Sequence, residues 1–440
     1  MNPLARAACF FAAFALAATV VPDHAQAQVS FSAALNQAIQ NSPRVRAAQA
    51  DVRKAQAGLA VMKDIFIPSV VVGGGLGTAT GITLSVPTIF TVSAQSLVYS
   101  PQQRSYIRSA RLDLKAANYA LADARDQVAQ DAADTYLTIC HDQAAVQAIS
   151  QQSEYRLNLV SIIEDRVNAH LDNELDLKKA RRDALQARLQ AMQIQDFLNM
   201  QRAHLSELTG IPANKLVAQP ASVPDLPELP DETADAMPEG PGLLAAETNQ
   251  QSREIHAHGD AQYTWKPTIN FGAQYGRVSP IENVSEFYNL HGDYNTASIG
   301  IQIQFPLLDR VRSAAAKASA ADAAHGAIDL ETQKIEQSEE QRKLERSAAE
   351  LGVKAQLADL DYGIAQDELQ SVLIAGKAST GPVPVTPKEE QNARIQERQA
   401  YLEMLDARLS ASRAQIDYLR QAGKLENWLH SLNSDLPMFR

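Results

Sequence analysis

The stretch of sequence that decides the fold runs from Trp265 to Arg312. It reads WKPTINFGAQYG, a polar loop, and then YNTASIGIQIQFPLLDRVR. Alternate positions are apolar on both sides of the loop: Ile269, Phe271, Ala273, Tyr275 and then Ile299, Ile301, Ile303, Phe305. This alternation predicts two strands with one apolar and one polar face. Because a lone two-stranded hairpin is not stable in water, the segments that it joins define the fold.

The composition of the chain favours long helices. Its 440 residues are 45% hydrophobic and 6% aromatic, and alanine, glutamine and charged residues dominate. These are good helix formers. The formal net charge of −11 argues against a nucleic-acid-binding protein, which needs a basic surface.

The first 27 residues have the features of a secretory signal peptide. Arg6 precedes an apolar run at residues 7–21, and Ala25-Gln26-Ala27 fits a cleavage site. We therefore expect an exported protein. Removal of residues 1–27 also removes Cys9, which leaves Cys140 as the single cysteine and allows no intramolecular disulfide.

The order of predicted elements occurs twice. The first structural repeat, residues 28–216, has a hairpin at about 65–98 and helices at about 101–168 and 175–209. A proline-rich linker is expected at 217–242. The second repeat, residues 243–432, has a hairpin at about 265–306 and helices at about 309–374 and 387–432, and residues 433–440 form a tail. The sequence therefore predicts an internal duplication.

The hairpins and the helices suggest a larger assembly. Ile395, Leu402, Leu409 and Ile416 recur every seven residues, and a second series of alanines lies two positions away. Two such seams indicate a helix packed between two neighbours. Strands of about 10 residues are long enough to cross a membrane. Four strands cannot close a barrel, so two copies with eight strands or three copies with twelve are the smallest closures.

The chain resembles the TolC-type outer-membrane efflux proteins over residues 30–432. The carrying residues are FPLLDRVR at 305–312 before an alanine-rich helix, QSLVY at 95–99 before Pro101, and Ala169-His170-Leu171 followed by LDLKKAR at 175–181. Each motif is degenerate, but their order, repeated twice, is specific.

The resemblance implies a mainly α fold with β-hairpins (α+β) and long coiled-coil helices. It implies a homotrimer with a 12-stranded outer-membrane β-barrel, in contact with outer-membrane lipid and continued by a periplasmic α-helical barrel. Such a protein is the passive export channel of a tripartite efflux or type I secretion system. It docks on a periplasmic membrane-fusion adaptor and an inner-membrane pump. No cofactor, metal or nucleic acid is expected.

Two groups of site residues follow from the resemblance. The helical tips would contact the adaptor through six residues, against the alternative that they are ordinary turns: Ala169, His170, Leu171, Ala375, Gly376 and Lys377. Four carboxylates would narrow and gate the pore: Asp172, Glu174, Asp176 and Glu389. The alternative for these acids is stabilisation of helix N-termini, which is favoured for Glu389.

This chain departs from the family pattern at both tips. His170 stands where a glycine is usual, and residues 379–385 look like an insertion. After the insertion, Thr386, Pro387 and Glu389 predict a capping box that opens the last helix.

A different class of function also fits the helical pattern. A periplasmic coiled-coil scaffold or adhesion protein without a channel would need the same long helices, and the outward face of the strands separates the two readings. An enzyme is not expected, because the chain has no phosphate-binding loop, nucleophile elbow, zinc-protease motif or CxxC motif.

Overall fold

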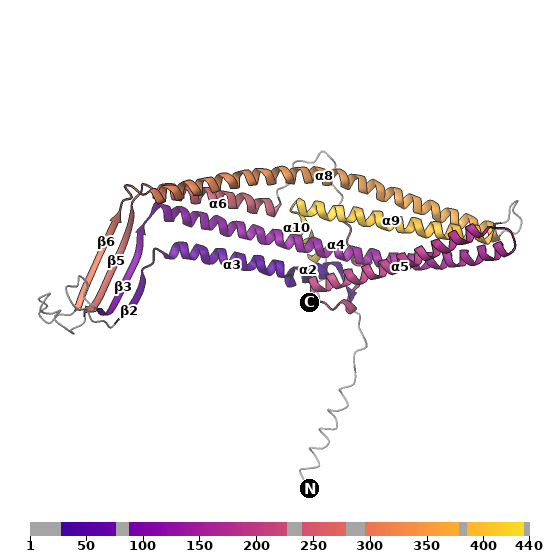
Figure 1. The fold of residues 1–440 in the computed structure, drawn as a ribbon, viewed down its shortest axis with the longest axis horizontal. Coiled ribbons are helices and arrows are strands. Elements are labelled where there is room, and N and C mark those ends of the chain that lie inside the picture. Colours follow the sequence, from indigo (N-terminus) through magenta and orange to yellow (C-terminus); the bar gives the residue numbers. More distant parts are fainter. Residues whose placement is uncertain (1–27, 76–87, 227–239, 279–294, 378–384, 435–440) are drawn as a thin grey trace, which may run out of the picture.

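The computed structural model describes residues 28–75, 88–226, 240–278, 295–377 and 385–434. The described chain is elongated, with a small sheet at one end and long helices that lead away from it to a pair of helical tips at the other end (Figure 1). The predicted signal peptide at 1–27 and most of the predicted insertion at 379–385 lie outside the described residues.

The first half of the chain forms helices, a hairpin and a long helical return. Its main elements are α2 (Phe31–Asn41), α3 (Pro43–Asp64), β2 (Ser69–Gly74), β3 (Thr88–Tyr99), α4 (Pro101–Asn168) and α5 (Glu174–Thr209). Short elements flank them: β1 (Gln28–Val29), η1 (Ala213–Lys215), β4 (Val217–Ala218) and η2 (Pro220–Ser222). Helix α4 begins where Ser100 Oγ accepts a hydrogen bond from the Gln103 N–H at 3.2 Å. Helix α5 ends at Gly210, which has a φ of 76°.

The second half repeats this order with one break. Its elements are α6 (Pro241–Tyr263), β5 (Thr268–Val278), β6 (Asn295–Gln304), α8 (Arg310–Lys377), α9 (Pro387–Gln421) and α10 (Leu425–Ser434). A single helix was expected over 387–432. The structure divides it, because the chain turns at Gly423, where φ is 62° and glycine meets no steric penalty.

The two hairpins join into one antiparallel sheet with the order β2-β3-β5-β6. Strands β3 and β5 are paired in its centre, for example through Ala94 opposite Ala273. The outer strands β2 and β6 each have one edge with no partner in the described chain. The duplicated hairpins are therefore neighbours in space, and the sheet remains open on both sides.

The helices form a single curved layer, which we call the helical wall. Next to the sheet the order across the wall is α3, α4, α6 and α8, and toward the tips it is α5, α4, α9 and α8. Helix α4 therefore has neighbours on both sides along its whole length. Helix α8 has neighbours on one side only, and α3 and α5 form the opposite edge.

The main core lies halfway along the wall and includes part of the expected linker. The Tyr136 hydroxyl donates to the Val29 carbonyl at 2.8 Å and accepts from the Gln219 N–H at 2.8 Å. Phe31 lies edge-on to both Tyr136 and Trp428. Residues 217–226 were expected to be extended and unpacked. Instead β4 pairs in parallel with β1, because this closes the core around Tyr136.

Within the described ranges, no helix is both long and apolar enough to cross a membrane.

Candidate channel wall and helical tips

The sheet has one apolar and one polar face. Residues directly opposite each other in antiparallel strands share a face, so the register defines both surfaces. One row across the sheet is Val70, Ala94, Ala273 and Ile299, and the adjacent row is Val71, Ser93, Gln274 and Ser298. The apolar face is broadly exposed, with Val70 65%, Val72 64%, Ile299 78% and Ile301 66% accessible. Exposed apolar surface of this extent marks a contact with lipid or with protein.

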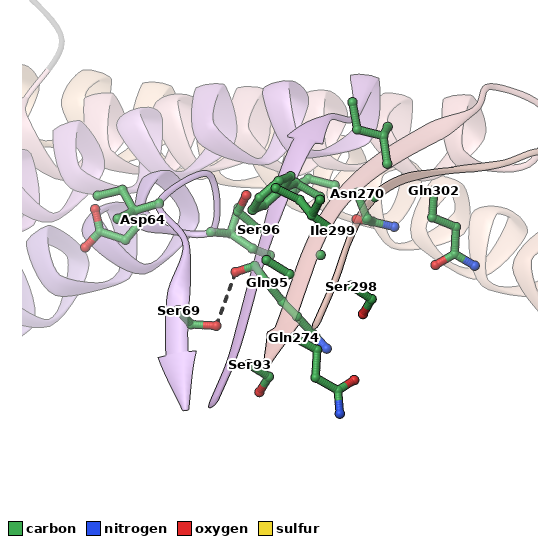
Figure 2. A pocket seen from close by; sticks show the side chains of 18 residues that line it. Asp64, Ser69, Ser93, Gln95, Ser96, Asn270, Gln274, Ser298, Ile299 and Gln302 are labelled. Carbon is green, nitrogen blue, oxygen red and sulfur yellow. Dashed lines mark hydrogen bonds between the residues drawn. The ribbon is translucent and has the colours of Figure 1, made fainter. Parts of the chain in front are cut away.

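The polar face lines a hollow of about 840 Å³, whose lining also includes Phe271, Ile299 and Ile301 from the apolar rows (Figure 2). Serine, glutamine and asparagine side chains of all four strands surround it, and Ser69 Oγ donates to the Gln95 carbonyl at 3.3 Å. Among the described residues that line the hollow, Asp64 is the only one with an ionisable side chain, and it lies at the end of α3 where the sheet meets the helical wall.

Both edges of the helical wall expose apolar seams. On α8, Val353, Leu357, Leu360 and Ile364 follow a 4-3-4 spacing and are 56–66% accessible. On α5, Leu185, Leu189 and Met192 follow a 4-3 spacing and are 55–66% accessible. Such spacing is typical of a coiled-coil seam, and neither seam has a partner helix within the described chain.

The first tip joins α4 to α5 through a left-handed turn. The Leu171 N–H donates to the Arg166 carbonyl at 2.8 Å, and the His170 N–H donates to the Val167 carbonyl at 2.9 Å. This pair of bonds is a Schellman motif. His170 has a φ of 59°, in the left-handed region that glycine adopts at no cost. The glycine that the family pattern led us to expect here would therefore suit this backbone.

The second tip differs from the first. Ala375, Gly376 and Lys377 form the exposed last turn of α8, three residues beyond the expected helix end at 374. Helix α9 then begins with the predicted capping box, which is confirmed: the Glu389 N–H donates to Thr386 Oγ1 at 3.3 Å, and the Thr386 N–H donates to the Glu389 carboxylate at 2.8 Å. The hydrogen bond from the Thr386 backbone lowers the pKa of Glu389.

Asp172 links the two tips. Arg166 Nε, at the end of α4, donates to its carboxylate at 2.9 Å, and Lys388 Nζ, at the start of α9, donates at 3.1 Å. The Asp172 side chain is only 10% accessible. The hydrogen bond from Arg166, followed by that from Lys388, lowers the pKa of Asp172 to about 2. This carboxylate is therefore charged at any physiological pH. We call the Arg166–Asp172–Lys388 contact the tip tether.

The other two carboxylates of the expected constriction lie in the first turn of α5. Glu174 is exposed, and Asp176 lies 4.0 Å from Lys179. The Asp176 N–H donates to Asn173 Oδ1 at 2.9 Å, so Asn173 caps this helix. Of the four expected acids, Asp172 and Glu389 thus already make contacts within the chain, while Glu174 and Asp176 have the position of acids that stabilise a helix N-terminus.

The sequence did not point to a polar contact between α4 and α9. His141 Nδ1 lies 2.9 Å from Asp142 of the same helix, and His141 Nε2 lies 2.8 Å from Asp406 of α9. Burial lowers the pKa of His141, but hydrogen bonds with Asp142 and Asp406 outweigh it and raise the pKa to about 9. The Lys388 and His141 contacts span more than two hundred residues of sequence, so no local pattern announces them.

No group of three or more His, Cys, Asp or Glu side chains within the described ranges is placed to hold a metal ion.

Comparison with known proteins identifies the first half of the chain by sequence. The model of the outer membrane efflux protein family matches residues 34–211. No curated protein sequence matches the chain. The matched family is described as outer membrane efflux protein, which agrees with the expected location in the outer membrane.

Solved structures extend the likeness to most of the chain. The CmeC outer membrane channel of Campylobacter jejuni has a TM-score of 0.73 at 13% identity, and the match covers 93% of this chain and 90% of CmeC. The outer membrane protein VceC of Vibrio cholerae has a TM-score of 0.69 at 16% identity, with 89% and 96% covered. The MtrE outer membrane channel of Neisseria gonorrhoeae has a TM-score of 0.68 at 12% identity, with 90% and 89% covered.

The helix-rich fold with its small antiparallel sheet is thus the fold of these channels. By sequence, residues 34–211, less than half of the chain, match the outer membrane efflux protein family, and the solved outer membrane channels add the likeness in fold.

Proposed function

We propose that three copies of this chain form a passive export duct across the outer membrane and the periplasm. The duct would serve a tripartite efflux or type I secretion system. Its helical tips would dock on a periplasmic adaptor that connects it to an inner-membrane pump. The observation that carries the proposal is that, among the described residues, both edges of the chain lack partners, at the outer strands β2 and β6 and at the apolar seams of α5 and α8.

The two unfinished edges are complementary. One consists of strand β2 and the α5 seam, and the other consists of strand β6 and the α8 seam. When β6 and α8 of one copy pair with β2 and α5 of the next, the backbone hydrogen bonds and the apolar seams are satisfied together. Such a head-to-tail contact uses two different surfaces, and it gives a closed ring when the rotation from copy to copy adds up to a full turn.

The number of strands favours three copies over two. Two copies would give eight strands, and the interior of an eight-stranded barrel is filled by its own side chains. Three copies would give twelve strands and a wider interior. The polar face that lines the hollow then faces the passage, and the exposed valines and isoleucines of the opposite face meet lipid.

The tips supply a surface for the adaptor. Leu171, Leu175 and Ile374 are 59–65% accessible at this end of the molecule, together with the other residues of both tips. Large apolar side chains in that position favour a protein contact. We propose the adaptor contact at Ala169, His170, Leu171, Ala375, Gly376 and Lys377.

We also propose a constriction at the tip end. Glu174 and Asp176 supply acidic groups at the start of α5. The tip tether at Asp172 holds the helix pair α4–α5 against the helix pair α8–α9. Release of the tether would let the two helix pairs separate and widen the opening. Glu389 contributes by fixing the start of α9 through its capping box.

The assembly is tested by the mass of the purified protein in mild detergent and by conductance in planar bilayers. We expect a species three times the mass of one chain and discrete conductance steps after its insertion. A monomer that gives no conductance would favour the scaffold without a channel.

The contact with the adaptor is tested separately with Leu171→Ser and Leu175→Ser. These changes should abolish export in cells while mass and conductance stay unchanged. Export at the normal level would show that the adaptor binds elsewhere.

A further inference from the structure

The distribution of charged residues between the sheet and the helices indicates how the proposed channel selects its solutes. This inference rests on the proposed function, because it takes the polar face of the sheet as the lining of the passage. We infer that the sheet-lined section is an electrically neutral sleeve that selects solutes by size and hydrogen bonding, and that Asp64 marks its border with the helical wall.

The sequence keeps ionisable residues out of the strands. The stretch from Ile65 to Gln103 contains no Asp, Glu, Lys, Arg or His, and the same holds from Tyr294 to Leu308. Among the described strand residues, Arg277 is the single charged one. The helices of the same chain are rich in charge, so the composition of the whole chain does not explain this difference.

The register places Arg277 away from the polar face. Arg277 lies opposite Phe90 and Asn295, two positions beyond Tyr275, and therefore shares the apolar face at the end of the sheet far from the helices. The polar face has hydroxyl and amide groups, such as Ser93, Gln274 and Ser298, with Val71 and Leu97 as its apolar members. The described part of this face has no fixed charge.

A lining without fixed charge treats anions and cations alike. Rings of carboxylates or of basic side chains concentrate one sign of ion in a pore, and they do so most strongly in a narrow, low-dielectric passage. Hydroxyl and amide groups both donate and accept hydrogen bonds, so they solvate solutes of either sign. The sleeve therefore suits bulky neutral, zwitterionic or amphipathic solutes and gives no preference for metal cations.

Asp64 is where selection by charge begins. Within the part of the chain that the structure describes, it is the only ionisable side chain that lines the hollow, and it lies at the helical end of the hollow (Figure 2). In a closed ring each copy contributes one Asp64. The local potential should therefore become negative toward this border, over the screening length of about 8 Å at physiological salt.

The test measures the local potential with charged thiol reagents on full-length trimers in lipid vesicles. Ser93→Cys and Ser298→Cys place a thiol on the polar face, and Ile303→Cys, outside the lining of the hollow, is the matched control on the apolar face of the same strand as Ser298. Cationic and anionic methanethiosulfonates of similar size are applied in separate reactions. The natural Cys140 gives little background, because burial raises the pKa of its thiol to about 12 and leaves almost no thiolate.

We expect both reagents to modify the two polar-face cysteines, at a rate ratio within about threefold of that of free cysteine, and neither reagent to modify Ile303→Cys. A preference of more than about tenfold for one reagent would overturn the neutral sleeve, because it would reveal a field from fixed charge. Modification of Ile303→Cys in place of the polar-face cysteines would also overturn it. Loss of the trimer or of conductance in the unmodified protein would instead refute the proposed function.

The border is tested with Gln95→Cys, which lies on the same hollow as Asp64, alone and combined with Asp64→Asn. The ratio of the cationic to the anionic modification rate should be higher at Gln95→Cys than at Ser298→Cys. Asp64→Asn should remove this difference. An unchanged ratio with Asp64→Asn would exclude Asp64 as the border. The same change should reduce the cation preference of the conducting trimer, read as the reversal potential in a salt gradient.

Discussion

Helices α4 and α8 occupy the same place in the two halves of the chain and have the same length of 68 residues, yet they differ in burial. Helix α4 buries residues from Pro101 to Ile163, whereas α8 buries only Ala323, Gly326 and Ala348 among its described side chains. The difference follows from position, because α4 has neighbours on both sides and α8 on one side. The duplicated chain thus packs its central helix on both sides and leaves the helix at its edge exposed.

The first test exchanges one isoleucine on each helix for alanine. Ile139 of α4 is 1% accessible, so Ile139→Ala should lower the free energy of unfolding of the single chain by about 2–5 kcal/mol. Ile364 of α8 is 56% accessible, and Ile364→Ala should change it by at most about 0.5 kcal/mol. Denaturant unfolding of the detergent-solubilised monomer measures both. Equal losses would contradict the contrast between the helices.

The second test charges the α8 seam. Leu357→Asp combined with Leu360→Asp should reduce the fraction of trimer by more than about tenfold, because each carboxylate would be buried without a partner at the interface. Helicity by circular dichroism should remain. Gln356→Asp, at an exposed position on the same helix, is the matched control and should leave the trimer intact. Trimers of normal mass with the charged seam would place the interface elsewhere.

The third test concerns the contact between α4 and α9 at His141. Its folded-state pKa of about 9 lies above the ordinary value of 6.5. The contact therefore stabilises the fold fully below pH 6.5, and the stabilisation is lost as the pH rises through 9. Asp134, whose pKa burial raises to about 7, completes most of its titration below pH 8. Between pH 8 and 10 the His141 contact should contribute a fall of about 1.3 kcal/mol in the unfolding free energy. The buried thiol of Cys140, whose pKa is raised to about 12, lowers stability in the same range, so the comparison is made in a Cys140→Ala background. There His141→Gln should flatten this part of the profile, and an unchanged slope would assign it to other groups.

The fourth test breaks the tip tether. Asp172→Asn removes the negative charge of the carboxylate that both Arg166 and Lys388 contact. Single channels should therefore spend more time in a wider, more conductive state. The pKa of Asp172 is depressed to about 2, so the tether is complete above the ordinary value of 3.8 and is lost as the pH falls toward 2. Conductance should therefore stay constant between pH 8 and 5. Asp183→Asn, farther along α5 and outside the proposed constriction, removes a carboxylate charge and serves as the control that leaves the tether in place.

The smallest effect is expected where α4 ends. His170 adopts a left-handed backbone, which costs a residue with a side chain about 1 kcal/mol relative to glycine. His170→Gly removes that cost but makes the unfolded chain more flexible, so we expect a net change within about 1 kcal/mol in the stabilising direction. His170→Val should be destabilising, because a β-branched side chain suits this conformation least. Opposite signs for the two variants in thermal unfolding would support this account of the tip.

Local signals were enough to predict the long helices and the strands. Ser100 and Pro101 mark the start of α4, and alternation in Ile299, Ile301 and Ile303 marks β6, because caps and two-residue periodicity are properties of adjacent residues. The capping box at Thr386 and Glu389 was likewise readable. The Gly423 turn had only a single glycine as its signal, which was too little to divide a strong helical pattern.

Contacts between distant segments could not be predicted from the chain itself. Strands β1 and β4 have two residues each and pair across most of the first half, so neither has a pattern of its own. Asp172 was expected to be a free acid of the pore, and its partner Lys388 lies 216 residues away. Such contacts depend on the packing of the wall, which no local spacing encodes.

The open edges of the sheet also determine the order in which the assembly forms. A free strand edge presents unpaired backbone N–H and C=O groups, and each such group costs several kcal/mol in hydrocarbon. A single copy, with β2 and β6 both unpaired, therefore cannot enter the membrane by itself. On the proposed assembly, association comes before or together with insertion. The same edges that let three chains close into one duct keep an incomplete duct out of the bilayer.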